Sequence, residues 1–198
     1  MTDEEEKDGI PVVFAATIHE WRDWLDREGP SAQAVWLVLF HTSSSRPSIR
    51  YAESIEQCLC FGWVDSKSIR RDEESAYLRF TPRKRTSTWS KVNRQRVQEM
   101  TEKGLMTPRG QAMIDYAKEN NLWEVLTDAE SDQIPEDLQL LFDRNPMALQ
   151  HFEVFPPSSR RLILEWIAKA KRPDTRQRRI EQTVELAEQN VRAAHPGR

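Results

Sequence analysis

The sequence has few residues of the kinds that build metal sites, disulfide frameworks and phosphate-binding loops. It contains two cysteines, six glycines and four histidines among 198 residues. Cys58 and Cys60 are separated by a single residue and the histidines are scattered, so neither a zinc site nor a set of disulfides is indicated. The glycines form no nucleotide-binding fingerprint. We therefore expect no metal and no cofactor.

Long apolar segments are also missing. The longest apolar run, residues 34–40, is too short to cross a bilayer. The chain does not open with a basic region followed by an apolar stretch, so no signal peptide is expected. These absences favour a cytoplasmic protein without membrane insertion, and the composition leaves its oligomeric state open.

Acidic residues are absent between Glu74 and Glu99, although the chain has a formal net charge of −3. The basic residues in this interval are Arg79, Arg83, Lys84, Arg85, Lys91, Arg94 and Arg96. The negative net charge argues against nucleic acid as a partner over the whole surface, while single-stranded nucleic acid at this interval remains an alternative. A second basic run, residues 169–179, joins two predicted helices, where cations stabilise a helix C-terminus without any ligand.

The pattern of apolar residues is typical of an α+β protein. It predicts strands at residues 11–15, 35–40, 63–69 and 76–81, with helices at 17–29, 51–61, 87–104 and 107–121. Prolines then introduce several further helical segments, and the last of these has an apolar stripe at helical spacing. We predict a small, mostly antiparallel sheet packed with helices, followed by an all-helical C-terminal region.

Three parts of the chain are expected. Residues 1–9 are acidic, have no apolar residue after Met1, and are predicted to be a disordered tail. Residues 10–127 would form the α+β core, and residues 133–196 a helical extension docked on it, because so short a helical region would be marginal alone. The intervening polar residues mark the boundary.

Arginines and hydroxyl groups lead into the helix predicted to begin near Ser87. The first N–H groups of a helix lack partners and carry partial positive charge, so this region predicts an anion site, with tryptophans as stacking faces. The candidate ligand-binding residues are Trp63, Arg79, Arg83, Arg85, Ser87, Trp89, Ser90, Lys91 and Asn93. The alternative is a solvated basic loop with Trp89 in the core.

Two functional hypotheses follow from these residues. The first is a non-catalytic module that binds a small anionic ligand, phosphate-like or nucleotide-like. The second is an enzyme in which Cys60 is a nucleophile or Asp65 a general base beside the arginines. No recognised catalytic motif is present, which favours the first hypothesis. The alternative for both cysteines is that they are small buried side chains.

Three short motifs carry a family resemblance. They are Cys60-Phe-Gly-Trp-Val-Asp65, Arg79-Phe-Thr-Pro-Arg83 and Ser87-Thr-Trp-Ser-Lys-Val-Asn93. With further matches along the chain after residue 12, they resemble the YdeI/OmpD-associated family, often described as bacteriocin-protection proteins. The resemblance implies a bacterial cytoplasmic protein with a role in bacteriocin or envelope-stress protection. It also implies a shared site formed by these motifs, without implying a reaction.

Overall fold

The computed structural model describes residues 5–194, apart from the side chain of Asp128, and divides the chain into two compact units. The first unit contains the residues up to 87 together with residues 92–119. The second contains residues 88–91 and the residues from 120 onward. Each unit has its own core and is described by itself.

The first unit is built on a five-stranded sheet with the order β1-β2-β3-β5-β4. Its strands are β1 (Glu6–Lys7), β2 (Ile10–Phe14), β3 (Val35–Phe40), β4 (Trp63–Arg70) and β5 (Ser75–Pro82). The strands β2 and β3 are parallel, and all other neighbours are antiparallel. The hairpin of β4 and β5 contains an irregularity between Asp65 and Lys67, where one residue has no partner in the register.

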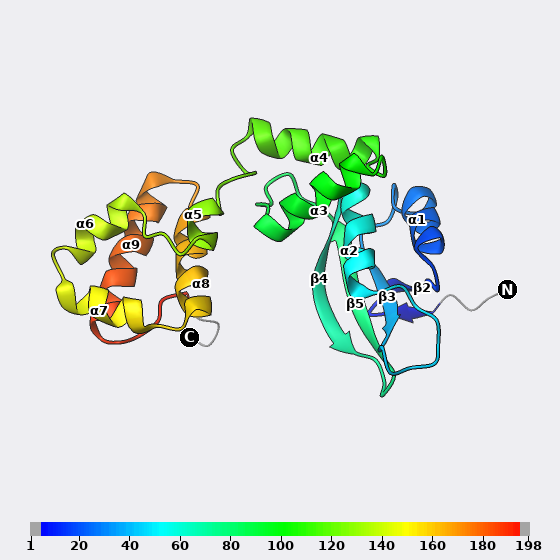
Figure 1. Cartoon of the computed structure of the whole chain (residues 1–198), viewed down its shortest axis with the longest axis horizontal. Coiled ribbons are helices and arrows are strands. Elements are labelled where there is room, and N and C mark those ends of the chain that lie inside the picture. The colour runs from blue at the N-terminus through cyan, green and yellow to red at the C-terminus, as the bar shows by residue number, and fades with distance from the viewer. Residues whose placement is uncertain (1–4, 195–198) are drawn as a thin grey trace. The chain divides into compact units, whose positions relative to one another are not determined.

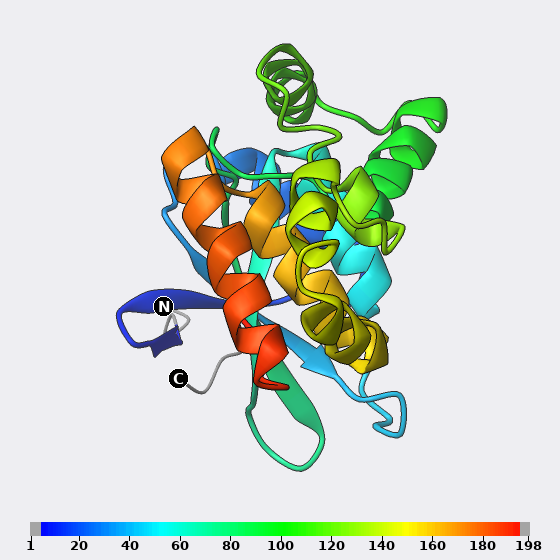
Figure 2. The same ribbon diagram turned by 90° about the vertical axis from the view of Figure 1, so that its left-hand side faces the viewer.

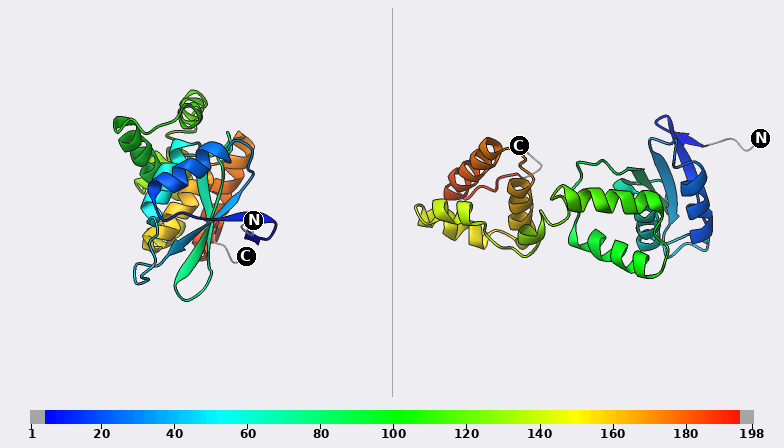
Figure 3. Two further views of the ribbon diagram at one scale, coloured as in Figure 1. Left: turned by 90° about the vertical axis from the view of Figure 1, so that its right-hand side faces the viewer. Right: turned by 90° about the horizontal axis from the view of Figure 1, so that it is seen from above.

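The helices of the first unit are α1 (Ile18–Arg27), α2 (Tyr51–Cys60), α3 (Lys91–Glu102) and α4 (Pro108–Glu119). Helix α1 begins with a capping box, in which Thr17 accepts from the backbone of Glu20 and Glu20 bonds back to the backbone of Thr17. Helices α1 and α2 lie side by side against the sheet (Figures 1 and 3). Trp21 connects these layers, because its ring contacts Phe80 of β5 and its Nε1 donates to the carbonyl of Ser54 at 3.1 Å.

The end of α2 meets the start of α4 at a close backbone contact. The carbonyl of Cys60 accepts from the backbone N of Thr107 at 3.2 Å and from its Oγ1 at 2.6 Å. A Cβ at Gly110 would lie 2.1 Å from that carbonyl oxygen, so only glycine fits. The chain leaves α2 through Gly62, whose φ of +75° favours glycine.

The second unit is helical. Its helices are α5 (Thr127–Glu130), α6 (Glu136–Phe142), α7 (Pro146–Val154), α8 (Pro157–Ala168) and α9 (Pro173–Glu188). Helix α9, orange to red in Figure 2, contacts α6, α7 and α8. Three of the four residues of the predicted stripe are buried on α9: Ile180, Val184 and Ala187 belong to one apolar core with Phe142 of α6 and Phe152 of α7. The fourth, Val191, lies after the end of the helix and is partly exposed.

The predicted α+β class is confirmed, and three expectations differ from the structure. Part of the tail that was predicted to be disordered is ordered: Glu6 and Lys7 form β1, while residues 1–4 lie outside the described residues. The carboxylate of the preceding Glu5 accepts hydrogen bonds from Tyr77 and Arg71. Helix α3 begins at residue 91 rather than 87. The units divide at residues 119 and 120 rather than at 128–133, and the docking of the second unit on the first remains a prediction.

Candidate functional site

A polar cluster in the first unit brings together residues from α2, β4, α3 and the chain just after β5. The hydroxyl of Tyr51, at the start of α2, donates to Oδ2 of Asp65 on β4 at 3.1 Å. The charges of Arg83 and Arg96 both lower the pKa of the Cys58 thiol against the larger effect of burial, so both guanidinium groups lie within electrostatic range of this part of α2. We call Tyr51, Asp65, Arg83 and Arg96 the arginine cluster.

The arginine cluster extends from the surface into the interior. Tyr51 is 52% exposed and Arg96 is partly exposed, whereas Arg83 is only 7% exposed. The backbone N of Arg83 donates to the carbonyl of Gly62 at 2.8 Å, which fixes the start of its side chain beside the end of α2. Helix α3 supplies Arg96, whose Nη1 donates to Oδ1 of Asn93 at 3.5 Å.

Burial gives Arg83 an unusual electrostatic state. Loss of hydration lowers its pKa to about 10, because burial disfavours the charged form, and the neighbouring Cys58 and Asp65 only partly oppose this. The side chain still carries a positive charge at neutral pH. Arg83 is the member of the cluster that has lost most of its water.

The same surroundings act on Tyr51 and the cysteines. Burial raises the pKa of Tyr51, and the charge of Asp65 and the hydrogen bond to it add to the rise. Burial raises the pKa of Cys58 strongly, and it also raises that of Cys60, against the lowering influence of Arg22. Both thiols are buried and free. A raised pKa leaves little thiolate at neutral pH, so Cys60 does not have the environment of an activated nucleophile.

The predicted anion site at the start of α3 is occupied by a carboxylate of the chain itself. Within the second unit, Oε1 of Glu130 accepts from the backbone N of Lys91 at 2.5 Å and lies 3.6 Å from Nη2 of Arg161. The Glu130 side chain is only 4% exposed. An internal acidic group therefore satisfies the partial positive charge that was expected to attract a ligand.

The two tryptophans expected to stack on a ligand are core residues instead. Trp63 is fully buried in the first unit, with its ring edge-on to Trp24 at 5.9 Å. Trp89 is 1% exposed in the second unit, where its ring contacts Trp123 at 5.1 Å and its backbone N donates to the carbonyl of Leu122. Trp89 is therefore a core residue, as the alternative to the anion site stated.

The remaining candidates are divided between the two units. Arg79 is partly exposed in the middle of β5, and the exposed Arg85 places its guanidinium 5.0 Å from the ring centre of Tyr116. Ser87 closes a turn by donating its backbone N to the carbonyl of Lys84. Ser90, like Lys91, belongs to the second unit, while Asn93 belongs to the first. Of the predicted residues, the structure thus gathers Asp65, Arg83 and Asn93 around one cluster.

The second basic run is largely tied to its own unit. Arg176 donates to both carboxylate oxygens of Asp137, at 2.6 and 2.9 Å, and Lys169 pairs with Glu165 at 2.9 Å. Arg179 donates to the carbonyl of Trp166 and lies over its ring. These contacts agree with the alternative in which the run stabilises helix ends.

Sequence reasoning missed Tyr51 and Arg96 as members of the arginine cluster. Tyr51 opens α2, which precedes the motif at residues 60–65, and only the turn at Gly62 brings β4 back beside it. A signal for Arg96 was present, because it lies one helical turn after Asn93 on α3 and inside the acid-free interval.

Two structural absences bear on the site. Within residues 5–194, no group of three or more His, Cys, Asp or Glu side chains could hold a metal ion. Over the same residues, no helix has the length and apolar character needed to span a membrane.

Comparison with known protein families found two matches. Residues 13–113 match a domain of unknown function, DUF8412. Residues 133–190 match the family described as bacteriocin-protection, YdeI or OmpD-associated. The expected YdeI/OmpD-associated resemblance is thus found in part of the chain, while the motif at residues 60–65 and the arginine cluster lie within the first match. Comparisons with curated proteins and with solved structures found no match.

Proposed function

Since this chain belongs to the family of the domain of unknown function DUF8412, whose description names no activity, we propose a function from the site itself: the first unit binds a small anion of the phosphate class at the arginine cluster. The observation that carries the proposal is the buried charge of Arg83. Its pKa is lowered to about 10, so the guanidinium is charged at neutral pH although it has lost most of its hydration. A bound anion would compensate that loss.

The four residues of the arginine cluster would have different roles in binding. Arg96 and Tyr51 lie at the exposed side of the cluster. Arg96 would donate to the anion, whereas the Tyr51 hydroxyl, whose proton is donated to Asp65, would accept from a hydroxyl group of the ligand. Arg83, the buried member of the cluster, would supply positive charge from the interior. Guanidinium groups suit phosphate because two of their N–H groups can bond to two of its oxygens. Asp65 orients the Tyr51 hydroxyl, and its negative charge would favour a ligand that also carries a hydroxyl group, such as a phosphorylated sugar.

Isothermal titration of the full chain with inorganic phosphate and with ribose 5-phosphate tests the proposal. Arg96→Gln should weaken binding by at least about tenfold, since a hydrogen bond to a charged group contributes roughly 1.5–3 kcal/mol. Tyr51→Phe should weaken ribose 5-phosphate more than phosphate. Arg27→Gln, an exposed change in the last turn of α1, is the control and should bind as the unmodified chain does. Absence of binding at millimolar anion, or equal binding by Arg96→Gln, would contradict the proposal.

We propose a cellular role from the family match of the second unit. Residues 133–190 are YdeI/OmpD-associated in sequence, and that family's description names bacteriocin protection. We therefore place the anion site in a protein that protects bacterial cells against bacteriocins. Expression of the chain in a bacteriocin-sensitive strain should raise survival, and Arg96→Gln should remove the gain without lowering the protein level. Equal survival with and without the chain would refute this role.

A further inference from the structure

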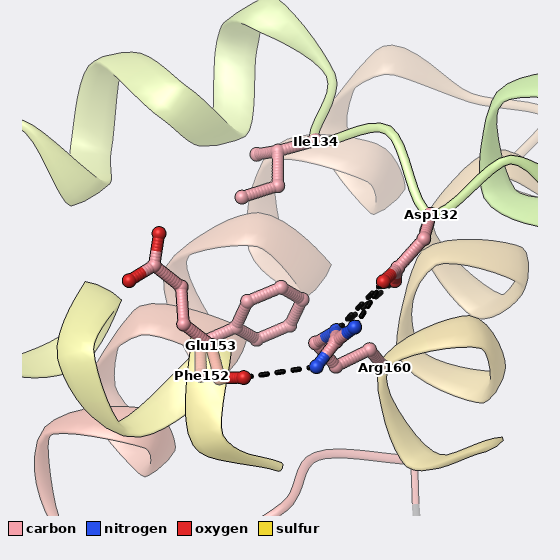
Figure 4. Close-up of a pocket in the computed structure, with 5 residues that line it drawn as sticks. All are labelled: Asp132, Ile134, Phe152, Glu153 and Arg160. Carbon is pink, nitrogen blue, oxygen red and sulfur yellow. Dashed lines mark hydrogen bonds and ion pairs between the residues drawn. The ribbon is translucent and has the colours of Figure 1, made fainter. Parts of the chain in front are cut away.

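The second unit contains a cavity of about 260 Å³, apart from the arginine cluster and lined by Asp132, Ile134, Phe152, Glu153 and Arg160 (Figure 4). This volume is below the roughly 300–1,000 Å³ of sites that enclose a cofactor or a drug-sized ligand. It suits one long side chain. The lining combines an apolar surface, from Ile134 and Phe152, with three charged groups.

Two of those charges neutralise each other. Nε of Arg160 donates to Oδ1 and Oδ2 of Asp132 at 3.1 and 2.9 Å, and its Nη2 bonds to the same carboxylate. Its Nη1 donates to the carbonyls of Glu153 and Phe155 at 2.9 and 3.0 Å. Arg160 thus joins the loop at residue 132 to the end of α7, which makes this wall of the cavity preformed.

Glu153 is the charge that remains. Its side chain is exposed, and among residues 5–194 its carboxylate has no hydrogen bond or ion pair. Figure 4 shows that carboxylate directed away from Arg160, with the ring of Phe152 between the two. The cavity therefore has one excess negative charge, located where α7 ends and where the helix dipole adds to it.

The surface beside the cavity is apolar. Val154, the last residue of α7, is 80% exposed, and Met147, seven residues earlier on the same helical face, is 57% exposed. A polar small molecule would gain nothing from these side chains. A peptide would, because a second side chain could cover Val154 while the first enters the cavity.

We propose that this cavity binds a lysine side chain of a partner peptide, with the ammonium at Glu153, the methylene stem along Phe152 and Ile134, and a following aliphatic residue over Val154. Of the two carboxylates that line the cavity, the ammonium would pair with the one that Arg160 does not bind. The stem of lysine is apolar and packs on aromatic surface while its charge stays near water. This inference does not depend on the anion site, which lies in the first unit.

Two capped peptides, acetyl-Ala-Lys-Leu-Ala-amide and its Gln-Leu counterpart, provide the test by NMR titration of the full chain. The lysine peptide should shift the amide signals of residues 132–134 and 152–154, and the glutamine peptide should bind at least fivefold more weakly. Glu153→Gln should weaken the lysine peptide to the same extent. Glu185→Gln, an exposed change of equal charge on α9, should leave it unchanged.

The peptide assignment also predicts a role for the apolar side chain. Val154→Ser should weaken the lysine peptide, and free lysine should bind more weakly than the peptide. Equal affinity for free lysine would overturn the assignment to a peptide partner. Shifts confined to other residues, or an unchanged affinity in Glu153→Gln, would overturn the site itself.

Discussion

Replacing Arg83 by methionine should remove anion binding without lowering the stability of the first unit. The side chain is 7% exposed and its pKa is lowered to about 10 by loss of hydration. One pKa unit corresponds to about 1.4 kcal/mol, so at neutral pH the charged form is disfavoured in the folded chain by about 3 kcal/mol. Methionine fills a similar volume without that desolvation cost, and Asp65 keeps its hydrogen bond from Tyr51. We expect a change between zero and a gain of about 3 kcal/mol.

The pH dependence has a defined sign. A base whose pKa is lower in the folded state than in the unfolded state binds fewer protons when folded, so stability rises with pH above the folded value. The cost of Arg83 is therefore fully present below pH 10 and diminishes as the pH rises past about 10. The stability advantage of Arg83→Met should decrease over the same range.

Hydrogen exchange measured by mass spectrometry is the suitable assay, because it reports on each unit by itself, whereas a single melting temperature would combine them. Amides of α2 and β5 report on the first unit. Unchanged or slower exchange in Arg83→Met, together with lost phosphate binding, would support a ligand-binding arginine. If exchange there accelerates by more than about tenfold, the change has cost more than about 1.4 kcal/mol, and Arg83 is a structural residue.

The remaining predictions concern structure. Gly110→Ala should destabilise the first unit by about 2 kcal/mol in urea unfolding, because the clash with the Cys60 carbonyl exceeds the roughly 1 kcal/mol that alanine gains in a helix. Gly104 has open space around it but a φ of +68°, so Gly104→Ala should lower the stability of the same unit by only about 1 kcal/mol. A stabilised Gly110→Ala would show that the helices separate easily. Asp137→Asn should cost the second unit about 1 kcal/mol at pH 7, since the hydrogen bond from Arg176 lowers the pKa of Asp137. This stabilisation is fully present above the ordinary pKa near 3.8 and is lost as the pH falls through the lowered pKa of the folded state, so the difference in unfolding free energy should shrink as the pH decreases below 3.8; a constant difference would refute the ionic origin.

Most of the fold could be predicted because local signals agreed with the tertiary structure. The continuous apolar run at residues 35–40 is β3, and Thr17 caps α1 as expected. The start of α3 was placed too early because Ser87 and Thr88 are good capping residues, whereas Trp89 is held by the second unit. Contacts between residues far apart in sequence decided that boundary, and no local pattern records them.

The candidate site was less predictable for the same reason. Arg83 was identified from the acid-free interval, but its burial depends on the whole first unit. The partner of the α3 start is Glu130, 39 residues further along the chain. The motif Cys60-Phe-Gly-Trp63 has a structural explanation: its first carbonyl anchors α4, Gly62 makes the turn, and Trp63 fills the core. A distinctive motif can thus reflect packing rather than chemistry.

The irregularity in β4 has a consequence for behaviour at high concentration. β4 is the outer strand on its side of the sheet, and the break in register between Asp65 and Lys67 interrupts its row of backbone groups. A lysine and a bulge on an exposed edge are features that discourage another chain from adding a strand. The opposite edge, β1, is only two residues long. The sheet is therefore poorly suited to growth by intermolecular strand pairing, and removing both Ser66 and the charge of Lys67 should make the chain prone to aggregation.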